Sequence, residues 1–211
     1  MKPARLRFAP DSAAGAALVQ WWLELHERQR GERAALNRAE SLESAVLSGD
    51  ADALRAFHRL GDAIAAAARA DEVPFRDYQA REDGSPRYND RDRLWPIAVL
   101  LASIRPERNG GPGSGRSEAL PRAMRRPGAN REACVSEQRF KRLLALDTPA
   151  ELLRPLRRVL ALLAQAGHPV DLYDLAAALY RWDERRRKNW AYAYFARSDE
   201  TARPDAAPVQ P

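Results

Sequence analysis

The strongest constraint on the fold lies in residues 149–166, where apolar side chains recur at the spacing of an α-helix. The segment Thr148-Pro149-Ala150-Glu151 combines an N-cap, a proline at the first helical position and a glutamate at the third. Gly167 and Pro169 follow as helix-ending residues. The pattern predicts a helix over 149–166 whose apolar side is formed by Leu152, Leu156, Val159, Leu160 and Leu163.

Similar patterns run along most of the chain. Helices are predicted over 16–30, from Gly31 through Leu47, and from an Asp50 cap through Ile64, with Gly49 as the stop between the last two. The fully apolar stretch 94–104 lacks the period-2 alternation typical of a strand, so it is predicted as a short buried helix. The fold class that follows is all-α.

The clearest break in the chain is PERNGGPGSGRS at 106–117. Glycine, proline and serine in this density are typical of a flexible connection. The sequence therefore predicts a two-lobed helical bundle, with an N-terminal helical lobe over 16–105 and a C-terminal basic lobe over 117–200. Residues 1–15, 106–116 and 201–211 are predicted to be flexible tails or a loop.

Positive charge is concentrated in the C-terminal half. The whole chain has a formal net charge of +6, and arginine accounts for 32 of its 35 basic residues. Residues 120–197 hold 16 Lys and Arg against 8 Asp and Glu, a net of +8, while the remainder carries 19 against 21, a net of −2. This asymmetry favours a polyanionic partner, although a solvated surface laced with salt bridges would give the same count.

The candidate nucleic-acid-binding residues are the basic side chains that the helical pattern gathers. On the helix over 149–166, Arg154, Arg157 and Arg158 fall opposite the apolar side, with no acid among them. Guanidinium groups can hold phosphate with two parallel hydrogen bonds. The predicted set is Arg33, Arg38, Arg139, Lys141, Arg142, Arg154, Arg157, Arg158, Arg185, Arg186, Arg187 and Lys188.

Catalytic, metal and cofactor sites are not indicated. His26, His58 and His168 are far apart in sequence, and Cys134 is the lone cysteine, so neither metal binding nor thiol catalysis is predicted. Gly110 to Ser117 has the spacing of a phosphate loop, but arginine replaces its lysine and no strand leads directly into it. No cofactor is expected.

The same sequence features predict a cytoplasmic protein. No apolar run approaches the roughly 20 residues that a membrane-spanning helix needs. The N-terminal residues lack the apolar stretch of a secretion signal. A single cysteine suits a reducing compartment.

Aromatic residues gather near both ends of the chain. They are Trp21, Trp22, Trp182, Trp190, Tyr192, Tyr194 and Phe195. Exposed aromatic rings can stack on bases. At helical spacing, however, most of these residues are better explained as core, and a core position is the prediction.

Three motifs together resemble a known family. They are SEQRFKRLLALDTPAELLRPLRRVLALL (136–163), LYRWDERRRKNWAYAYF (179–195) and, less specifically, RGERAALNRAE (30–40). They look like elements of the small subunit, also called CasB, of the type I-E CRISPR surveillance complex Cascade, and the resemblance covers roughly 16–197. The chain departs from the family pattern at Asn37-Arg38, where two arginines are frequent, and in SEALPRAM (117–124), which lacks an expected glycine.

The resemblance implies an all-α, two-lobed protein without catalytic activity. It further implies a head-to-tail pair inside Cascade that contacts the guide RNA (crRNA), the target DNA and other Cascade subunits, and stabilises the R-loop in antiviral defence. Base pairing by the guide would supply sequence specificity, so such a protein needs only basic side chains that contact the phosphate backbone of the nucleic acid. Two alternatives are a helical DNA-binding regulator, with 171–187 as part of a helix-turn-helix, and a scaffold whose arginines serve protein contacts.

Overall fold

The computed structural model describes residues 5–76, 90–109, 118–128 and 131–196. Within these ranges the chain is helical, which confirms the predicted all-α class, and extended pairing is confined to isolated bridges. The elements are α1 (Ala13–Glu27), α2 (Arg30–Arg38), α3 (Leu42–Ser48), α4 (Ala51–Ala70), the 3₁₀ turn η1 (Asp92–Leu94), α5 (Trp95–Ser103), α6 (Pro106–Asn109), α7 (Leu120–Arg125), α8 (Glu137–Leu144), α9 (Pro149–Gln165), α10 (Leu172–Tyr180) and α11 (Glu184–Phe195).

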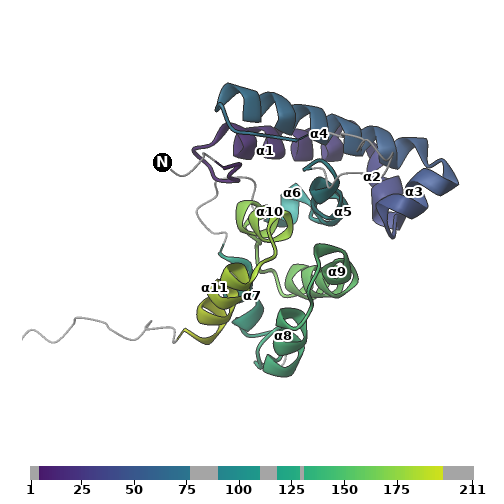
Figure 1. The fold of residues 1–211 in the computed structure, drawn as a ribbon. Helices are drawn as coiled ribbons and strands as arrows, with labels where there is room; N and C mark the ends of the chain where they lie inside the picture. Colours follow the sequence, from purple (N-terminus) through teal and green to yellow (C-terminus); the bar gives the residue numbers. More distant parts are fainter. Residues whose placement is uncertain (1–4, 77–89, 110–117, 129–130, 197–211) are drawn as a thin grey trace, which may run out of the picture.

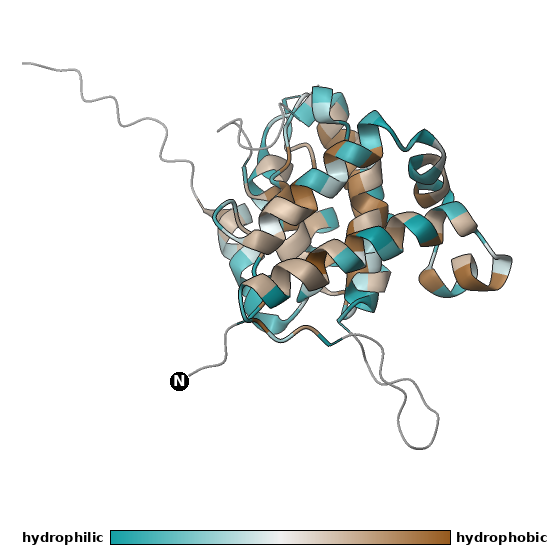
Figure 2. Ribbon diagram, turned by 90° about the horizontal axis from the view of Figure 1, so that it is seen from above, coloured by the Kyte–Doolittle hydropathy of each residue, from teal (hydrophilic) through white to brown (hydrophobic). Residues whose placement is uncertain are grey.

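Helices α1 and α4 lie side by side along one edge of the molecule, and α2 packs against both (Figure 1). The predicted stop and start between α3 and α4 are present: Gly49 has a φ of 65°, and the Asp50 side chain accepts a hydrogen bond from the Ala53 N–H. A left-handed φ suits glycine because it has no β-carbon. The hydrophobic residues gather toward the middle of the molecule, and the outer turns are mainly hydrophilic (Figure 2).

The predicted single helix from Gly31 through Leu47 is wrong, because α2 ends at Arg38 and α3 begins at Leu42. Ala39 is extended, with a ψ of 133°. The Ser41 side chain then accepts a hydrogen bond from the Ser44 N–H and completes a capping box for α3. A serine that caps a new helix competes with continuation of the old one.

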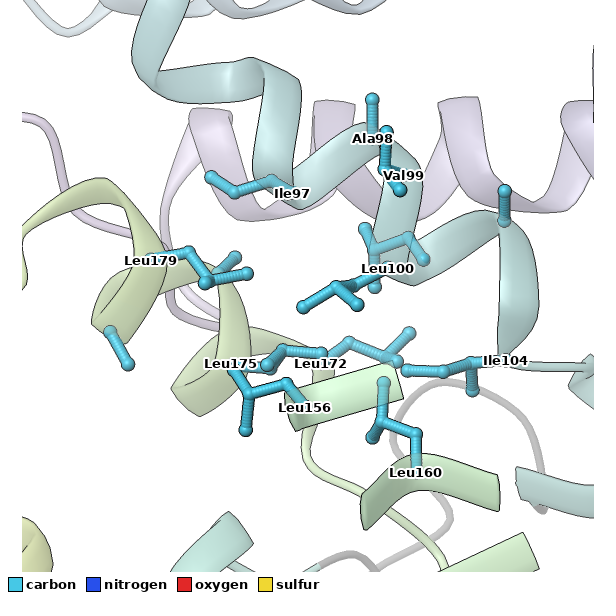
Figure 3. Close-up of a cluster of buried hydrophobic side chains, with 14 of the residues drawn as sticks. Ile97, Ala98, Val99, Leu100, Ile104, Leu156, Leu160, Leu172, Leu175 and Leu179 are labelled. Atoms are coloured by element: carbon cyan, nitrogen blue, oxygen red, sulfur yellow. The ribbon is translucent and has the colours of Figure 1, made fainter. Parts of the chain in front are cut away.

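Helix α5 joins the two halves of the molecule. It is buried from Trp95 through Ala102 and packs against α1, α2 and α4 on one side and against α9 and α10 on the other. Figure 3 shows Ile97, Leu100 and Ile104 facing leucines of α9 and α10. The hydrophobic core is therefore continuous across the predicted boundary at 105, and the division into two lobes remains a prediction.

Two segments predicted as flexible contain structure. Phe8 is 5% exposed and packs edge-to-face against Tyr180, while Ser12 caps α1. Gly15 allows the approach of this segment, because a β-carbon there would collide with the carbonyl of Ala9. Residues 106–109, predicted as the start of a loop, form α6, and the rest of that segment, with the phosphate-loop spacing at 110–117, lies outside the described residues.

The side chain of Asn109 fixes the end of α6 to the backbone of Val170. It is 4% exposed; its Nδ2 donates to the Val170 carbonyl over 2.9 Å, and its Oδ1 accepts from the Val170 N–H over 2.6 Å. Burying an amide is favourable only when its hydrogen bonds are satisfied. The sequence does not reveal this pair, because its members are 61 residues apart.

The C-terminal half confirms the predicted helix over 149–166 and most of the predicted aromatic core. Thr148 and Glu151 form the expected capping box. Trp182 packs edge-to-face on Trp190, with ring centroids 4.9 Å apart, and the rings of Phe140 and Tyr194 stack at 3.9 Å. Two aromatic residues of α11 differ from the prediction, since Tyr192 is 75% exposed and Phe195 is 43% exposed.

Candidate nucleic-acid interface

A groove of about 540 Å³ runs between α8 and α9, and three arginines line it. Arg139 and Arg142 come from α8, one turn apart, and Arg158 comes from α9 on the other wall. We call this hollow the α8–α9 groove and these residues the groove arginines. All three side chains are exposed, and no carboxylate of the described residues lies within ion-pair distance of them.

The floor of the α8–α9 groove is apolar. It is formed by the inner edges of the two amphipathic helices and the segments beside them, through Val135, Leu143, Leu146, Pro155, Val159 and Leu162. The hollow continues past Arg139 and Arg142 toward Ser136, Gln138 and Cys134. The combination of an apolar floor with guanidinium walls suits a ligand that has both anionic and uncharged parts.

The electrostatics of the groove favour an anion. Between α8 and α9 the lining holds the three groove arginines and Gln165 as its polar members, without an acid. Like charges held together on low-dielectric walls concentrate their field and attract counter-ions such as phosphates. Glu132 lines the neighbouring part, beyond Arg139, and has interactions of its own.

The other two arginines of α9 serve a different purpose. Arg154 pairs with Glu40 at 3.0 Å, and the Arg157 guanidinium donates to the carbonyls of Leu36 at 3.1 Å and Ala39 at 2.7 Å. These carbonyls lie at the C-terminus of α2, where helical C=O groups lack partners and a cation is stabilising. Burial lowers the pKa of Arg157 below its usual value, while nearby Glu40 opposes that shift.

The remaining predicted residues divide into paired and unpaired groups. Lys141 and Lys188 form ion pairs one turn back along their own helices, while Arg186 and Arg187 reach Asp174 and Asp147. Arg33 contacts the Nδ1 atom of His26 at 3.2 Å. Arg38 and Arg185 are exposed and have no acidic partner within the described ranges.

The family assignment follows from a comparison with known families. The family model for CRISPR-associated protein Cse2 matches residues 32–195. The chain belongs to this family. No curated protein and no solved structure matches the chain significantly.

The Cse2 match confirms the resemblance to the small subunit of type I-E Cascade. It begins within α2 and ends at the last residue of α11, so it includes the α8–α9 groove and leaves α1 outside. The groove of this Cse2-family chain thus lies in the part of the sequence that defines the family.

Two polar residues of the groove in this Cse2-family chain were not predicted. Gln165 follows Arg158 by seven residues, two turns of helix, so helical spacing could have placed it on the same side of α9. Gln138 lies directly before Arg139. Both amides can exchange hydrogen bonds with phosphate or base atoms.

In the described ranges, no three His, Cys, Asp or Glu side chains are grouped so that they could hold a metal ion. Among the same residues, no helix combines the length and the apolar character needed to cross a bilayer.

Proposed function

We propose that this chain is the non-catalytic small subunit of a type I-E Cascade complex. In that role it holds crRNA and target DNA through phosphate contacts, without reading sequence, and stabilises the R-loop in cytoplasmic antiviral defence. The observation that carries the proposal is the α8–α9 groove, which gathers Arg139, Arg142 and Arg158 with their guanidinium groups unpaired by described acids.

Phosphate contact is the chemistry that the groove supports best. Arginine offers a planar array of donors to two phosphate oxygens, whereas sequence reading requires side chains to enter a duplex groove. The walls of the α8–α9 groove are two facing helices, so neither helix projects alone as a recognition helix would. In an RNA-guided complex, base pairing selects the target and the protein needs to hold only the backbone.

Protein partners are supported by a second surface. Helix α3 lies at the end of the molecule away from α8 and α11 (Figure 1). It exposes Val46 by 57% and Leu47 by 80%. Apolar side chains exposed next to each other favour contact with another protein, so we assign this end to other Cascade subunits or to the head-to-tail copy.

The scaffold alternative differs from this proposal in what it requires of the arginines. A scaffold would use them in protein contacts, as Arg154 and Arg157 are used within the chain. The groove arginines are instead grouped around a hollow. The helix-turn-helix alternative has some geometric basis, because α10 and α11 are joined by only three residues, 181–183, but α11 buries Trp190 and Tyr194.

The test is nucleic-acid binding by the purified chain as a function of salt. Replacing all three groove arginines with alanine should lower the slope of log affinity against log salt by about two to three, since each lost phosphate contact removes roughly 0.7 to 0.9. A matched control is Lys141→Ala with Arg154→Ala and Arg7→Ala, which removes the same charge from exposed, ion-paired positions outside α11.

The outcomes separate the three functions. Equal slopes for the groove variant and the unmodified chain, with helicity intact, would favour the scaffold. Strong preference for one DNA sequence would favour the regulator. A reduced slope in the groove variant alone, with equal affinity for unrelated sequences, is the expected result.

A further inference from the structure

Helix α11 presents a solvent-facing row of three side chains that the groove does not use. Arg185, Asn189 and Tyr192 are spaced by four and three residues, so they lie on one side of the helix, and all are exposed. Trp190 and Tyr194 occupy the opposite, buried side. We call the row Arg185, Asn189 and Tyr192 the α11 face.

Tyr192 is unusual among the aromatic residues of α11. Its side chain is 75% exposed and makes no ring contact with any described aromatic residue, whereas Trp190 and Tyr194 pack in the core. Arg185, two turns earlier, has no acidic partner among the residues described. An uncovered aromatic ring therefore shares one helix face with an unpaired guanidinium.

The charge around the α11 face indicates the sign of its partner. Helix α11 carries Arg185, Arg186, Arg187 and Lys188 against a single acid, Glu184. Its net charge of +3 is a poor match for a cationic or neutral apolar surface and a good match for a polyanion. Lys188 lies one turn before Tyr192 and pairs with Glu184, so the cation on this side of the helix that lacks an acidic partner among the described residues is Arg185.

We propose that the α11 face binds single-stranded nucleic acid by stacking an unpaired base on Tyr192. Arg185 neutralises a neighbouring phosphate, and Asn189, between them, donates to or accepts from the base edge. A duplex keeps its base faces stacked inside, so it cannot offer one to Tyr192. The ligand class rests on the proposed function, but the site is separate from the α8–α9 groove and adds selectivity for opened strands.

The proposal is supported by general features of single-strand recognition. Proteins that bind single strands combine positive charge along the backbone with aromatic platforms for the bases. Arg185 and Tyr192 are about 10 Å apart along the helix axis, because each residue rises about 1.5 Å. This places an anion-binding group and a stacking group within reach of the same short stretch of one strand.

The experiment compares Tyr192→Ala with Tyr192→Phe in the full chain. Affinities are measured for a fluorescently labelled single-stranded oligonucleotide and for the corresponding duplex, over a range of salt. Tyr192→Ala should weaken single-strand binding about five-fold to a hundred-fold, the contribution typical of one base on an aromatic ring. Duplex affinity and the salt slope should stay unchanged, because no cation is removed.

Tyr192→Phe keeps the ring and should bind single strands within about two-fold of the unmodified chain if stacking is the interaction. Arg185→Ala should lower the single-strand salt slope by about 0.7. A single-stranded oligonucleotide with 5-bromouracil should crosslink to Tyr192 in ultraviolet light and not to Tyr194. Because Tyr192 is exposed, its substitutions should leave the helicity unchanged.

Three results would overturn the inference: unchanged single-strand affinity in Tyr192→Ala, equal losses for single strand and duplex, or equal losses in Tyr192→Phe and Tyr192→Ala. If Tyr192→Ala binds normally while the groove variant loses salt dependence, the inference about the α11 face fails and the proposed function stands. If neither variant changes binding, the proposed function fails as well.

Discussion

The two sides of α9 use the same residue type in different ways. Toward α2, Arg157 hydrogen bonds to two backbone carbonyls and Arg154 pairs with Glu40. Toward α8, Arg158 projects into a groove with two other arginines and no described acid within ion-pair distance. Arg157 and Arg158 are adjacent in sequence, and what separates them is the element that each one faces.

This difference shows that local charge does not determine whether a cation is available to a ligand. The C-terminus of α2 presents backbone carbonyls that lack helical partners, and these attract the guanidinium of Arg157. The wall of α8 presents arginines, which can only share an anion with Arg158. We therefore expect the α2 side of α9 to affect folding and the α8 side to affect binding.

The largest expected effect is on stability. Arg157→Ala should reduce the free energy of unfolding by about 2 kcal/mol, because it leaves the Leu36 and Ala39 carbonyls without a charged donor. Arg158→Ala, its neighbour on the groove side, should change stability by less than about 0.5 kcal/mol. Urea unfolding followed by circular dichroism measures both values. Equal stabilities would mean that water replaces Arg157 without loss.

A second expected effect concerns the assembled complex. With alanine at all three groove arginines, retention of opened target DNA should fall several-fold, about 1 kcal/mol or more, while crRNA loading changes less. Dissociation of labelled target DNA and the amount of crRNA copurified with the complex measure the two quantities. The control is Arg154→Ala on the α2 side. Equal losses of crRNA and target DNA would contradict the proposed role in holding the opened strands.

A smaller effect should appear in the pH dependence of stability. His26 contacts the Leu101 carbonyl through Nε2 at 3.3 Å and Arg33 through Nδ1 at 3.2 Å, so it joins α1 to α2 and α5 in its neutral form. Burial lowers the pKa of His26 below 6.5, the Leu101 hydrogen bond opposes this shift, and the charge of Arg33 adds to it.

The sign of the pH effect follows from that lowered pKa. The unfolded chain binds a proton at His26 before the folded chain does, so stability falls as the pH drops from above 6.5 through the lowered pKa of the folded state. His26→Gln should remove this part of the dependence, whereas the groove variant should keep it. Unfolding midpoints measured from pH 7.5 down to about pH 5 test the prediction. An unchanged profile in His26→Gln would contradict it.

The sequence predicts those parts of the fold that depend on local signals. The Thr148 capping box, the Gly49 stop and the buried helix over 95–103 each arise within a few residues, and the structure contains all three. The helical pattern does not predict the division between α2 and α3, because it runs on through Ser41, whose side chain caps α3. Helical spacing alone predicts that Arg139 and Arg142 lie on the same side of α8 and so line the same wall of the groove.

The parts that could not be predicted depend on contacts between distant residues. Arg157 meets carbonyls 121 and 118 positions away, and Asn109 meets Val170 across 61. Tyr192 and Tyr194 are two residues apart on one helix, and only the position of the neighbouring helices exposes the first and buries the second. Helical periodicity gives the relative direction of side chains, but not which direction meets solvent.

The most direct test of the difference between the two sides of α9 is a pair of single substitutions. Arg154 and Arg158 are both exposed, lie one turn apart and carry the same charge, and only Arg154 has an acidic partner among the described residues. The slope of log affinity against log salt for single-stranded DNA is measured for Arg154→Ala and for Arg158→Ala. We expect Arg158→Ala to lower the slope by about 0.7 to 0.9 and Arg154→Ala to leave it unchanged. Equal slopes for the two variants would contradict the assignment of binding to the groove side.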